Sequence, residues 1–149
     1  MNTQVPVNNK NEMLLSPIDL CDSRGDLIHA ASVVIWDEAP MVNRAVLACV
    51  DDVCCKIMAN SLPFGGKIVI LLGDFRQTCP VVHGGSQADV IDASIKSSPL
   101  WHLFQVFPLT APIRNADDPE FALWVDNIGD GAGPDVNMDL STLSPVSKT

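Results

Sequence analysis

The stretch SVVIWDEAP, residues 32–40, places an unbroken apolar run directly before two acidic residues. Apolar residues that follow one another without polar alternation are typical of a strand covered on both faces, as in a parallel sheet. A second run of this kind, KIVILLGD, occupies residues 67–74, and a third, QVFPLT, occupies residues 105–110. Pro108 marks the third as an edge strand or the end of a strand. The three runs together predict a parallel sheet.

Helical patterns lie between and after the runs. Apolar residues recur at steps of three and four from residue 42 to residue 58, which predicts a helix between the first two strands. Pro40 suits the first turn of this helix, and Asp52 is placed to pair with Lys56 one turn on. A strand, a crossover helix and a second strand make a βαβ unit, so the predicted fold class is α/β.

Later segments also carry helix signals. Ser86-x-x-Asp89 and Ser98-Pro99 are typical helix starts before the third run. Residues 118–129 begin with Asp-Pro-Glu and end with glycine, which predicts a helix with one apolar face. Each tryptophan lies in an apolar pattern, so all three are expected in the core: Trp36, Trp101 and Trp124.

The length and composition indicate one domain. A chain of 149 residues with 47% hydrophobic content is long enough to bury a core. We expect residues 18–131 to form the domain, residues 1–17 to be poorly ordered and residues 132–149 to be a loose tail. No apolar stretch has the length of a membrane span, and no export signal opens the sequence, so we expect a soluble, intracellular protein without membrane contact.

Charge and cysteine content limit the classes of function. Nine basic and eighteen acidic residues give a net charge of -9, whose field repels a polyanion. Any DNA track therefore has to be narrow or supplied by another part of the protein. The five cysteines contain no Cys-x-x-Cys spacing, so we expect reduced thiols rather than a zinc site.

Polar residues stand at the end of each apolar run. Ligands bind at the carboxyl ends of the strands in open α/β sheets, so these residues are the candidate site. Asp37 is placed to hold Mg²⁺, and the adjacent Glu38 to orient or deprotonate water. After the second run, Gly73 permits a close approach, Asp74 can support the metal shell, and Gln77 can reach a terminal phosphate.

The third run leads to Arg114, which is placed to stabilise charge on a transferring phosphoryl group. Each motif also has a plainer interpretation: a solvated loop start for Asp37 and Glu38, a turn capped by Asp74, and a surface position for Arg114. The occurrence of all three in order favours a phosphate site.

Five motifs carry a resemblance to a known family: VVIWDEAP at residues 33–40, PFGGK at 63–67, GDFRQ at 73–77, LT followed by an arginine at 109–114, and FALWVDNIGDG at 121–131. Together they resemble the petite-integration-frequency family of superfamily-one DNA helicases, especially its branch found in Helitron transposons. DEAP and GDFRQ at this spacing are the specific motifs, whereas GGK and the final helix are supportive.

The resemblance implies a partial RecA-like parallel sheet with flanking helices, and ATP and Mg²⁺ as cofactors. It implies that Asp37 holds Mg²⁺, Glu38 activates the attacking water and Gln77 contacts the terminal phosphate. Arg114 would act as the arginine finger. The segment that couples the state of the bound nucleotide to the affinity for DNA would comprise Gly73, Asp74, Phe75 and Arg76.

The resemblance also implies a biological setting. Members unwind DNA with five-prime to three-prime polarity, contact single strands and duplex junctions, and serve repair, recombination and telomere maintenance. We expect the nucleus rather than the mitochondrion. Nucleic-acid contact by an aromatic residue would fall to Phe75, because the tryptophans are expected in the core.

Two features depart from the family pattern. Pro112 and Ile113 precede Arg114 where asparagine and methionine are commoner, and a proline there restricts the backbone that aims the arginine. No G-x-x-x-x-G-K-[ST] loop, which cradles phosphates, occurs in the sequence. Gly65-Gly66-Lys67 precedes a strand and predicts a turn. We therefore expect a fragment of a P-loop NTPase core that lacks its first strand and loop.

Two alternatives stay open. The chain could be a binding module or an inactive remnant of a transposon-derived helicase, because loss of the loop removes most phosphate contacts. It could instead be a metal-dependent phosphohydrolase that uses Asp37, Glu38 and Asp74. In that case Gln77 and Arg114 would have no role.

Overall fold

A computed structural model describes residues 14–18, 22–111, 113 and 117–131. The elements in chain order are α1 (Ser23–Ala30), β1 (Val33–Trp36), α2 (Arg44–Ile57), β2 (Ile68–Leu71), α3 (Gln87–Ala93) and α4 (Pro119–Gly129). Four 3₁₀ turns lie among them, at Ala39–Met41, Pro63–Gly66, Ile95–Ser97 and Trp101–Leu103. The chain divides into one compact unit up to Phe107 and a second from Pro108 onward, and each is described by itself.

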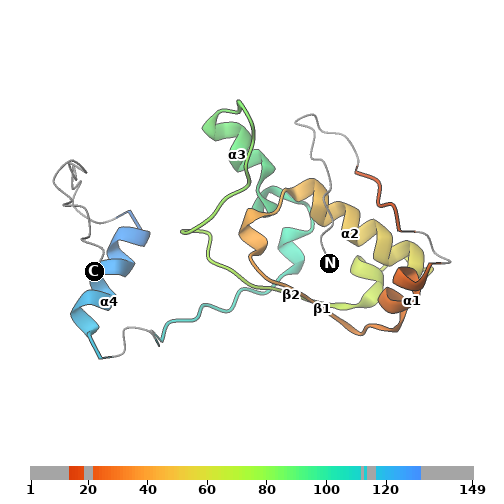
Figure 1. The fold of residues 1–149 in the computed structure, drawn as a ribbon, viewed down its shortest axis with the longest axis horizontal. Coiled ribbons are helices and arrows are strands. Elements are labelled where there is room, and N and C mark those ends of the chain that lie inside the picture. The colour runs from red at the N-terminus through yellow and green to blue at the C-terminus, as the bar shows by residue number, and fades with distance from the viewer. Residues whose placement is uncertain (1–13, 19–21, 112, 114–116, 132–149) are drawn as a thin grey trace, which may run out of the picture. The chain divides into compact units, whose positions relative to one another are not determined.

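The first unit contains the predicted βαβ arrangement. Strands β1 and β2 pair in parallel, with Val33 opposite Ile68 and Trp36 opposite Leu71. Helix α2 connects them and runs along one side of the strands (Figure 1). The α/β fold class and the parallel pairing of the first two apolar runs are therefore confirmed.

The described part of the chain covers one face of this sheet. Trp36, Val69 and Leu71 point toward the core and pack against its buried residues. The alternate side chains, which form the outer sheet face, are between 42% and 66% exposed: Val33, Ile35, Ile68 and Ile70. The continuous apolar runs predicted that other elements would pack on both faces of the sheet. Among the described residues, no element buries the outer face.

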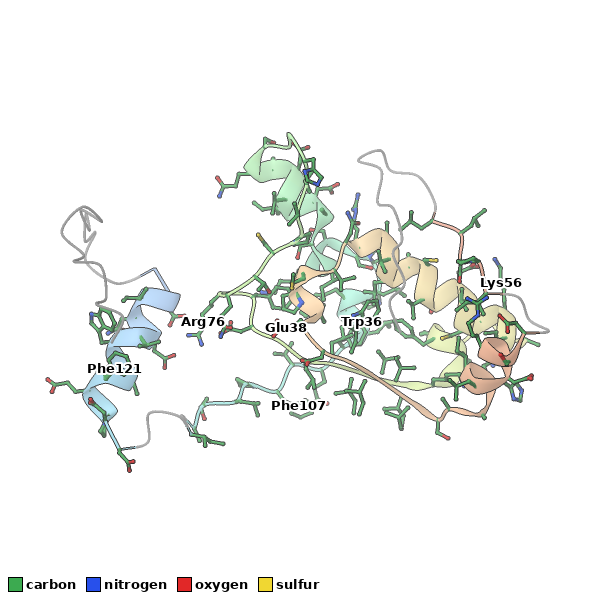
Figure 2. The ribbon with its side chains drawn as sticks, in the orientation of Figure 1. Trp36, Glu38, Lys56, Arg76, Phe107 and Phe121 are labelled. Atoms are coloured by element: carbon green, nitrogen blue, oxygen red, sulfur yellow. The ribbon has the colours of Figure 1, made fainter. Side chains whose placement is uncertain are left out.

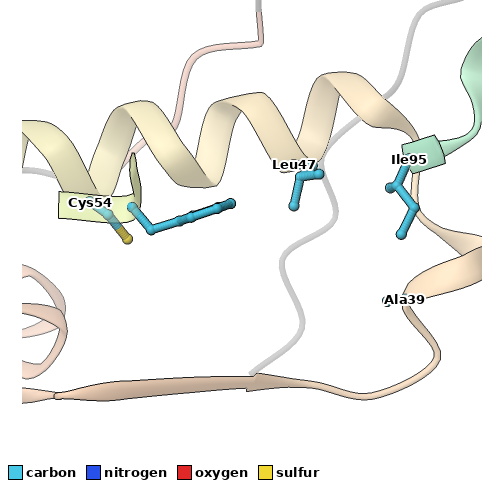
Figure 3. Packing of buried hydrophobic residues seen from close by; sticks show 5 residues of the cluster. Ala39, Leu47, Cys54 and Ile95 are labelled. Carbon is cyan, nitrogen blue, oxygen red and sulfur yellow. The ribbon is translucent and has the colours of Figure 1, made fainter. Parts of the chain in front are cut away.

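Helix α2 supplies two of the five residues of the buried cluster. Asn43 caps its first turn by accepting the backbone N–H of Ala45 at 2.9 Å. Leu47 and Cys54 point from α2 toward the sheet (Figure 3). The expected ion pair between Asp52 and Lys56 is present, with Nζ and Oδ2 2.6 Å apart. The buried cluster consists of Ala39, Leu47, Cys54, Phe64 and Ile95.

Pro40 does not lie in the first turn of α2, contrary to expectation. It belongs to the separate 3₁₀ turn Ala39–Met41, and its side chain is among the fully buried ones. The chain leaves the helical conformation at Val42 (φ -83°, ψ 135°) before Asn43 starts α2. The proline therefore packs next to the end of β1 instead of starting the helix.

The glycine pair before β2 forms a turn, as predicted. Asp51 of α2 accepts the backbone N–H of Phe64 at 2.6 Å. A Cβ added to Gly65 would lie 2.5 Å from the carbonyl oxygen of Cys54, so this position has no room for a side chain. Lys67 then donates from Nζ to the carbonyl of Ala31 at 2.6 Å, which ties the start of β2 to the end of α1.

The segment after α3 differs from its prediction. Helix α3 begins with a complete capping box between Ser86 and Asp89, as expected. The Ser98-Pro99 signal produces only the short 3₁₀ turn Trp101–Leu103. The third apolar run, residues 105–109, is not a strand, and Leu109 is 97% exposed. A strand needs a neighbour for its backbone hydrogen bonds, and the described residues provide none here.

Helix α4 of the second unit has the predicted bounds. Asp118 caps it by accepting the N–H of Phe121 at 3.0 Å. None of its residues is buried, and Trp124, expected in a core, is 46% exposed and stacks on Phe121. Across the described residues, no helix combines the length and apolarity that crossing a bilayer requires. Of the predicted loose ends at residues 1–17 and 132–149, residues 1–13 and 132–149 lie outside the described residues.

The core packing generates a stability prediction. Leu47 is 0% exposed, so Leu47→Ala should lower the free energy of unfolding by about 2–5 kcal/mol through lost contacts and a cavity. Leu27 on α1 is 65% exposed, and Leu27→Ala should change it by less than about 0.5 kcal/mol. Urea unfolding followed by circular dichroism measures both. Equal losses in the two variants would contradict the core described above.

Candidate functional site

The loops that follow β1 and β2 leave the same edge of the sheet. Trp36 and Leu71, the last residues of the strands, are paired in register. The N–H of Leu72 donates to the carbonyl of Trp36 at 2.8 Å, and the N–H of Ala39 donates to the carbonyl of Leu72 at 2.9 Å. These bonds carry the pairing beyond the strands. The structure thus brings the DEAP and GDFRQ motifs side by side (Figure 2).

Asp37 and Glu38 both have exposed side chains at this edge. Asp37 Oδ1 accepts the backbone N–H of Glu38 at 3.0 Å, which leaves its second carboxylate oxygen toward solvent. Glu38 has a φ of 53°, in the left-handed region that residues other than glycine seldom adopt. Its carbonyl accepts the N–H of Met41 at 3.1 Å, so the 3₁₀ turn holds this conformation. Backbone strain of this kind is common at functional sites.

The GDFRQ segment is organised by Asp74. Its Oδ1 accepts the backbone N–H of Arg76 at 2.9 Å and also receives the guanidinium of Arg76 at 3.3 Å. Its Oδ2 accepts from Nε2 of Gln77 at 3.3 Å. The hydrogen bond from the backbone N–H of Arg76 is the main cause that holds the pKa of Asp74 below its usual value, and the bond from the Arg76 side chain is the second. Asp74 is therefore a structural acceptor for this loop, and the capped turn of the plainer interpretation is present.

Phe75 packs inward. Its ring meets the ring of Trp101 edge-on, with centroids 5.6 Å apart, and Nζ of Lys96 lies 4.0 Å from its centroid. The side chain is half-buried and packs against the core cluster. The sequence favoured Phe75 as the aromatic residue available to a nucleic acid, and in the structure its ring is engaged with Trp101 and Lys96. Trp36 and Trp101 lie in the core as predicted.

The carboxylates at this edge provide only part of a coordination shell for Mg²⁺. Among the described residues, no group of three or more His, Cys, Asp or Glu side chains could hold a metal ion. Asp74 is already engaged by Arg76 and Gln77. Asp37 and Glu38 are exposed, and Asp37, directly after β1, keeps a carboxylate oxygen that Glu38 N–H does not use. One carboxylate suits the mode in which Mg²⁺ keeps its waters and is shared with substrate phosphates.

The cations of the described part are largely engaged. Four of them form ion pairs with nearby aspartates: Arg24, Arg44, Lys56 and Arg76. Lys67 donates to backbone carbonyls, and Lys96 lies over the ring of Phe75. The predicted arginine finger, Arg114, lies outside the described residues together with Pro112. Among the residues that the structure describes, no cluster of unpaired positive charge therefore lies beside Asp37.

Sequence reasoning missed one participant at this edge. Pro40 is buried directly beneath the two loops and adjoins Gly73, whose close approach was predicted without a partner. The proline inside the DEAP motif was the available signal, but its spacing to α2 suggested a helix start instead.

Comparisons with known proteins agree with the motifs. The family described as PIF1-like helicase matches residues 2–139. The ATP-dependent DNA helicase PIF1 of Candida albicans is 30% identical over 110 residues, which cover 69% of this chain and 12% of that protein. The chain thus spans about an eighth of this curated relative's length.

Solved structures share the fold. The Bacteroides Pif1 helicase in complex with ADP-AlF3 and ssDNA has a TM-score of 0.68 at 23% identity, covering 80% of this chain and 30% of that one. The Pif1 helicase of Candida albicans has a TM-score of 0.63 at 26% identity, covering 74% and 24% respectively. A RecA-like α/β fold is therefore shown for this chain.

The Asp74 contacts generate a titration prediction. In a pH titration of carboxyl ¹³C signals, Asp74 should titrate below the ordinary aspartate value of about 3.9. A lowered folded-state pKa stabilises the fold above the unfolded value, and this stability is lost as pH falls through the folded value. Arg76→Gln should move the pKa part of the way back, since the backbone N–H remains. Gln77→Ala should move it less, and a pKa at or above the ordinary value would refute the described network.

Proposed function

Because this chain belongs to the family of PIF1-like helicases, we propose that it forms the metal-binding and phosphate-sensing part of an ATP-dependent DNA helicase motor. One observation carries the proposal: the DEAP and GDFRQ loops are joined at the carboxyl edge of a parallel sheet by the hydrogen bond from Ala39 to Leu72. This is the edge where α/β folds bind ligands. The motor would unwind DNA with five-prime to three-prime polarity.

The residues at this edge have separate proposed roles. Asp37 would hold Mg²⁺ through the carboxylate oxygen that Glu38 does not occupy. The bound ion would neutralise charge on the ATP phosphates. Glu38, exposed and adjacent, would orient the attacking water and accept its proton. Gln77, tethered to Asp74 through Nε2, would contact the terminal phosphate.

The remaining roles concern coupling and the transition state. Gly73, Asp74, Phe75 and Arg76 would relay the state of the nucleotide to the DNA-binding surface. Phe75 suits this relay because it connects the loop to Trp101 in the core. Arg114 would act as the arginine finger, which typically accelerates phosphoryl transfer by about 10³–10⁵.

The motor needs parts beyond these residues. The 149 residues contain no G-x-x-x-x-G-K-[ST] loop, and we propose that this phosphate-binding loop is supplied from outside them. DNA would be held largely by other parts too, because the chain carries a net charge of -9. A related Bacteroides Pif1 was solved with ssDNA, which supports DNA as the partner of the complete protein. We place its work in nuclear genome maintenance, in a Helitron-type branch.

Two other functions remain as competitors. A remnant without turnover would keep this fold and its motifs but would not bind Mg²⁺ with nucleotide. A metal-dependent phosphohydrolase would need several carboxylates around one ion. The described residues contain no such group of three, and Asp74 is already occupied by Arg76. The structure therefore favours the helicase motor over the phosphohydrolase.

The 149-residue chain alone should not hydrolyse ATP above background in the presence of Mg²⁺, because most of the phosphate contacts of such motors come from the missing loop. A malachite-green assay for released phosphate checks this. Robust turnover that Glu38→Gln abolishes would contradict the need for an external loop. Phosphatase activity unaffected by Gln77→Ala would support the phosphohydrolase.

The proposed role of Glu38 can be tested by ATP hydrolysis in the polypeptide that the full reading frame encodes. In the polypeptide encoded by the full reading frame around this sequence, Glu38→Gln should lower kcat for DNA-stimulated ATP hydrolysis by at least about 10²-fold, with ATP affinity retained. Glu120→Gln on α4 is the matched control and should leave kcat unchanged. A full reading frame without any phosphate-binding loop, or unchanged hydrolysis in Glu38→Gln, would favour the remnant.

A further inference from the structure

Pro40 and Gly73 form a close contact between the two loops of the proposed site. A Cβ placed on Gly73 would lie 2.4 Å from Cδ and 2.9 Å from Cγ of Pro40. Real Cβ atoms do not approach other atoms so closely, so the proline ring occupies the space that a side chain would need. Gly73 also has a φ of 140°, a conformation that L side chains rarely adopt. Only glycine satisfies both conditions.

The proline is held in place from several sides. Its side chain is among the fully buried ones, and the preceding Ala39 is 3% exposed. Ala39 donates its N–H to Leu72, the residue directly before Gly73. Pro40 has no N–H and a fixed φ, so it lies in the 3₁₀ turn without leaving a backbone donor unsatisfied. The residue that precedes this turn is Glu38, whose backbone has the left-handed conformation.

We propose that Pro40 is a positioning residue: its ring, packed against Gly73, fixes Glu38 relative to the segment from Asp74 to Gln77. The inference rests on the proposed function for the roles of Glu38 and Gln77. The structural part of the inference does not depend on that function: a change at Gly73 displaces the Pro40 ring, and this displacement moves the backbone of Asp37 and Glu38. The water-activating and phosphate-sensing groups would then move together.

The contact predicts a specific pattern in paired variants. Gly73→Ala alone forces the ring and the loop apart. Pro40→Ala alone removes the ring and leaves a gap beside a flexible glycine. Combining the two places the added methyl group in the vacated space, so the double variant should recover part of what Gly73→Ala loses. Recovery is incomplete because the positive φ at residue 73 still opposes a side chain.

Amide NMR spectra of the 149-residue chain provide the readout. Gly73→Ala should shift the amide signals of Asp37, Glu38 and Gln77 and lower the melting temperature by several degrees. Adding Pro40→Ala should return these signals toward their original positions and raise the melting temperature again. Pro63 also lies in a 3₁₀ turn, but that turn precedes β2 and Gly73 follows it, and Pro63 is not among the residues that a Cβ on Gly73 would meet. Adding Pro63→Ala is therefore the matched control and should rescue neither quantity.

Every outcome decides the inference. If Gly73→Ala does not fold, a folded double variant supports the contact, and a double variant no better than the single one refutes it. Unchanged Asp37 and Glu38 signals in a folded Gly73→Ala variant would also refute it.

Titration of the same samples with Mg²⁺ separates this inference from the proposed function. Gly73→Ala should weaken the Mg²⁺-induced shifts at Asp37, and the double variant should restore them. Failure of the unmodified chain to respond to Mg²⁺ would count against the proposed function, while the amide signals would still test the role of Pro40.

Discussion

The hydrogen bond from the N–H of Ala39 to the carbonyl of Leu72 is the constraint on which the site depends. It continues the parallel pairing of β1 and β2 past their last residues, at the point where both loops turn away from the sheet. Without it, Asp37 and Glu38 would be an acidic pair on an independent loop. With it, the DEAP and GDFRQ motifs are held next to each other at the edge of the sheet, although they are far apart in the sequence. The buried Pro40 fills the space behind this bond.

The elements that sequence predicted well are those determined by neighbours in the chain. The apolar spacing gave α2 nearly to its ends, and local hydrogen bonds gave the capping box of α3 and the start of α4. Predictions that depended on distant partners were less successful. Residues 105–109 have strand-like composition, but composition does not provide a neighbouring strand. The outer sheet face and Trp124 are apolar in the same way, and the described residues leave both exposed.

The site shows the same division. Sequence singled out Asp37, Glu38 and Gln77 because they follow two successive apolar runs within motifs that resemble those of one family. Strands β1 and β2 do bring the two segments to one edge. It predicted a close approach at Gly73 but not the residue that approaches. It also treated Phe75 as a possible ligand contact, because sequence does not reveal that Trp101 and Lys96 would converge on its ring. Partners of this kind are set by tertiary packing alone.

Charge explains why this edge is one part of a site. Asp37 and Glu38 are exposed acids, and Arg76, the cation of the neighbouring GDFRQ segment, is paired with Asp74. Such an edge attracts a divalent cation and repels a triphosphate. A nucleotide can therefore lie here only if Mg²⁺ and further cations compensate its phosphates. In the proposed motor, a phosphate-binding loop with its lysine and the arginine Arg114 would supply compensation of that type. The acidity that argues against DNA binding by this chain alone is thus consistent with a metal-holding role inside a larger motor.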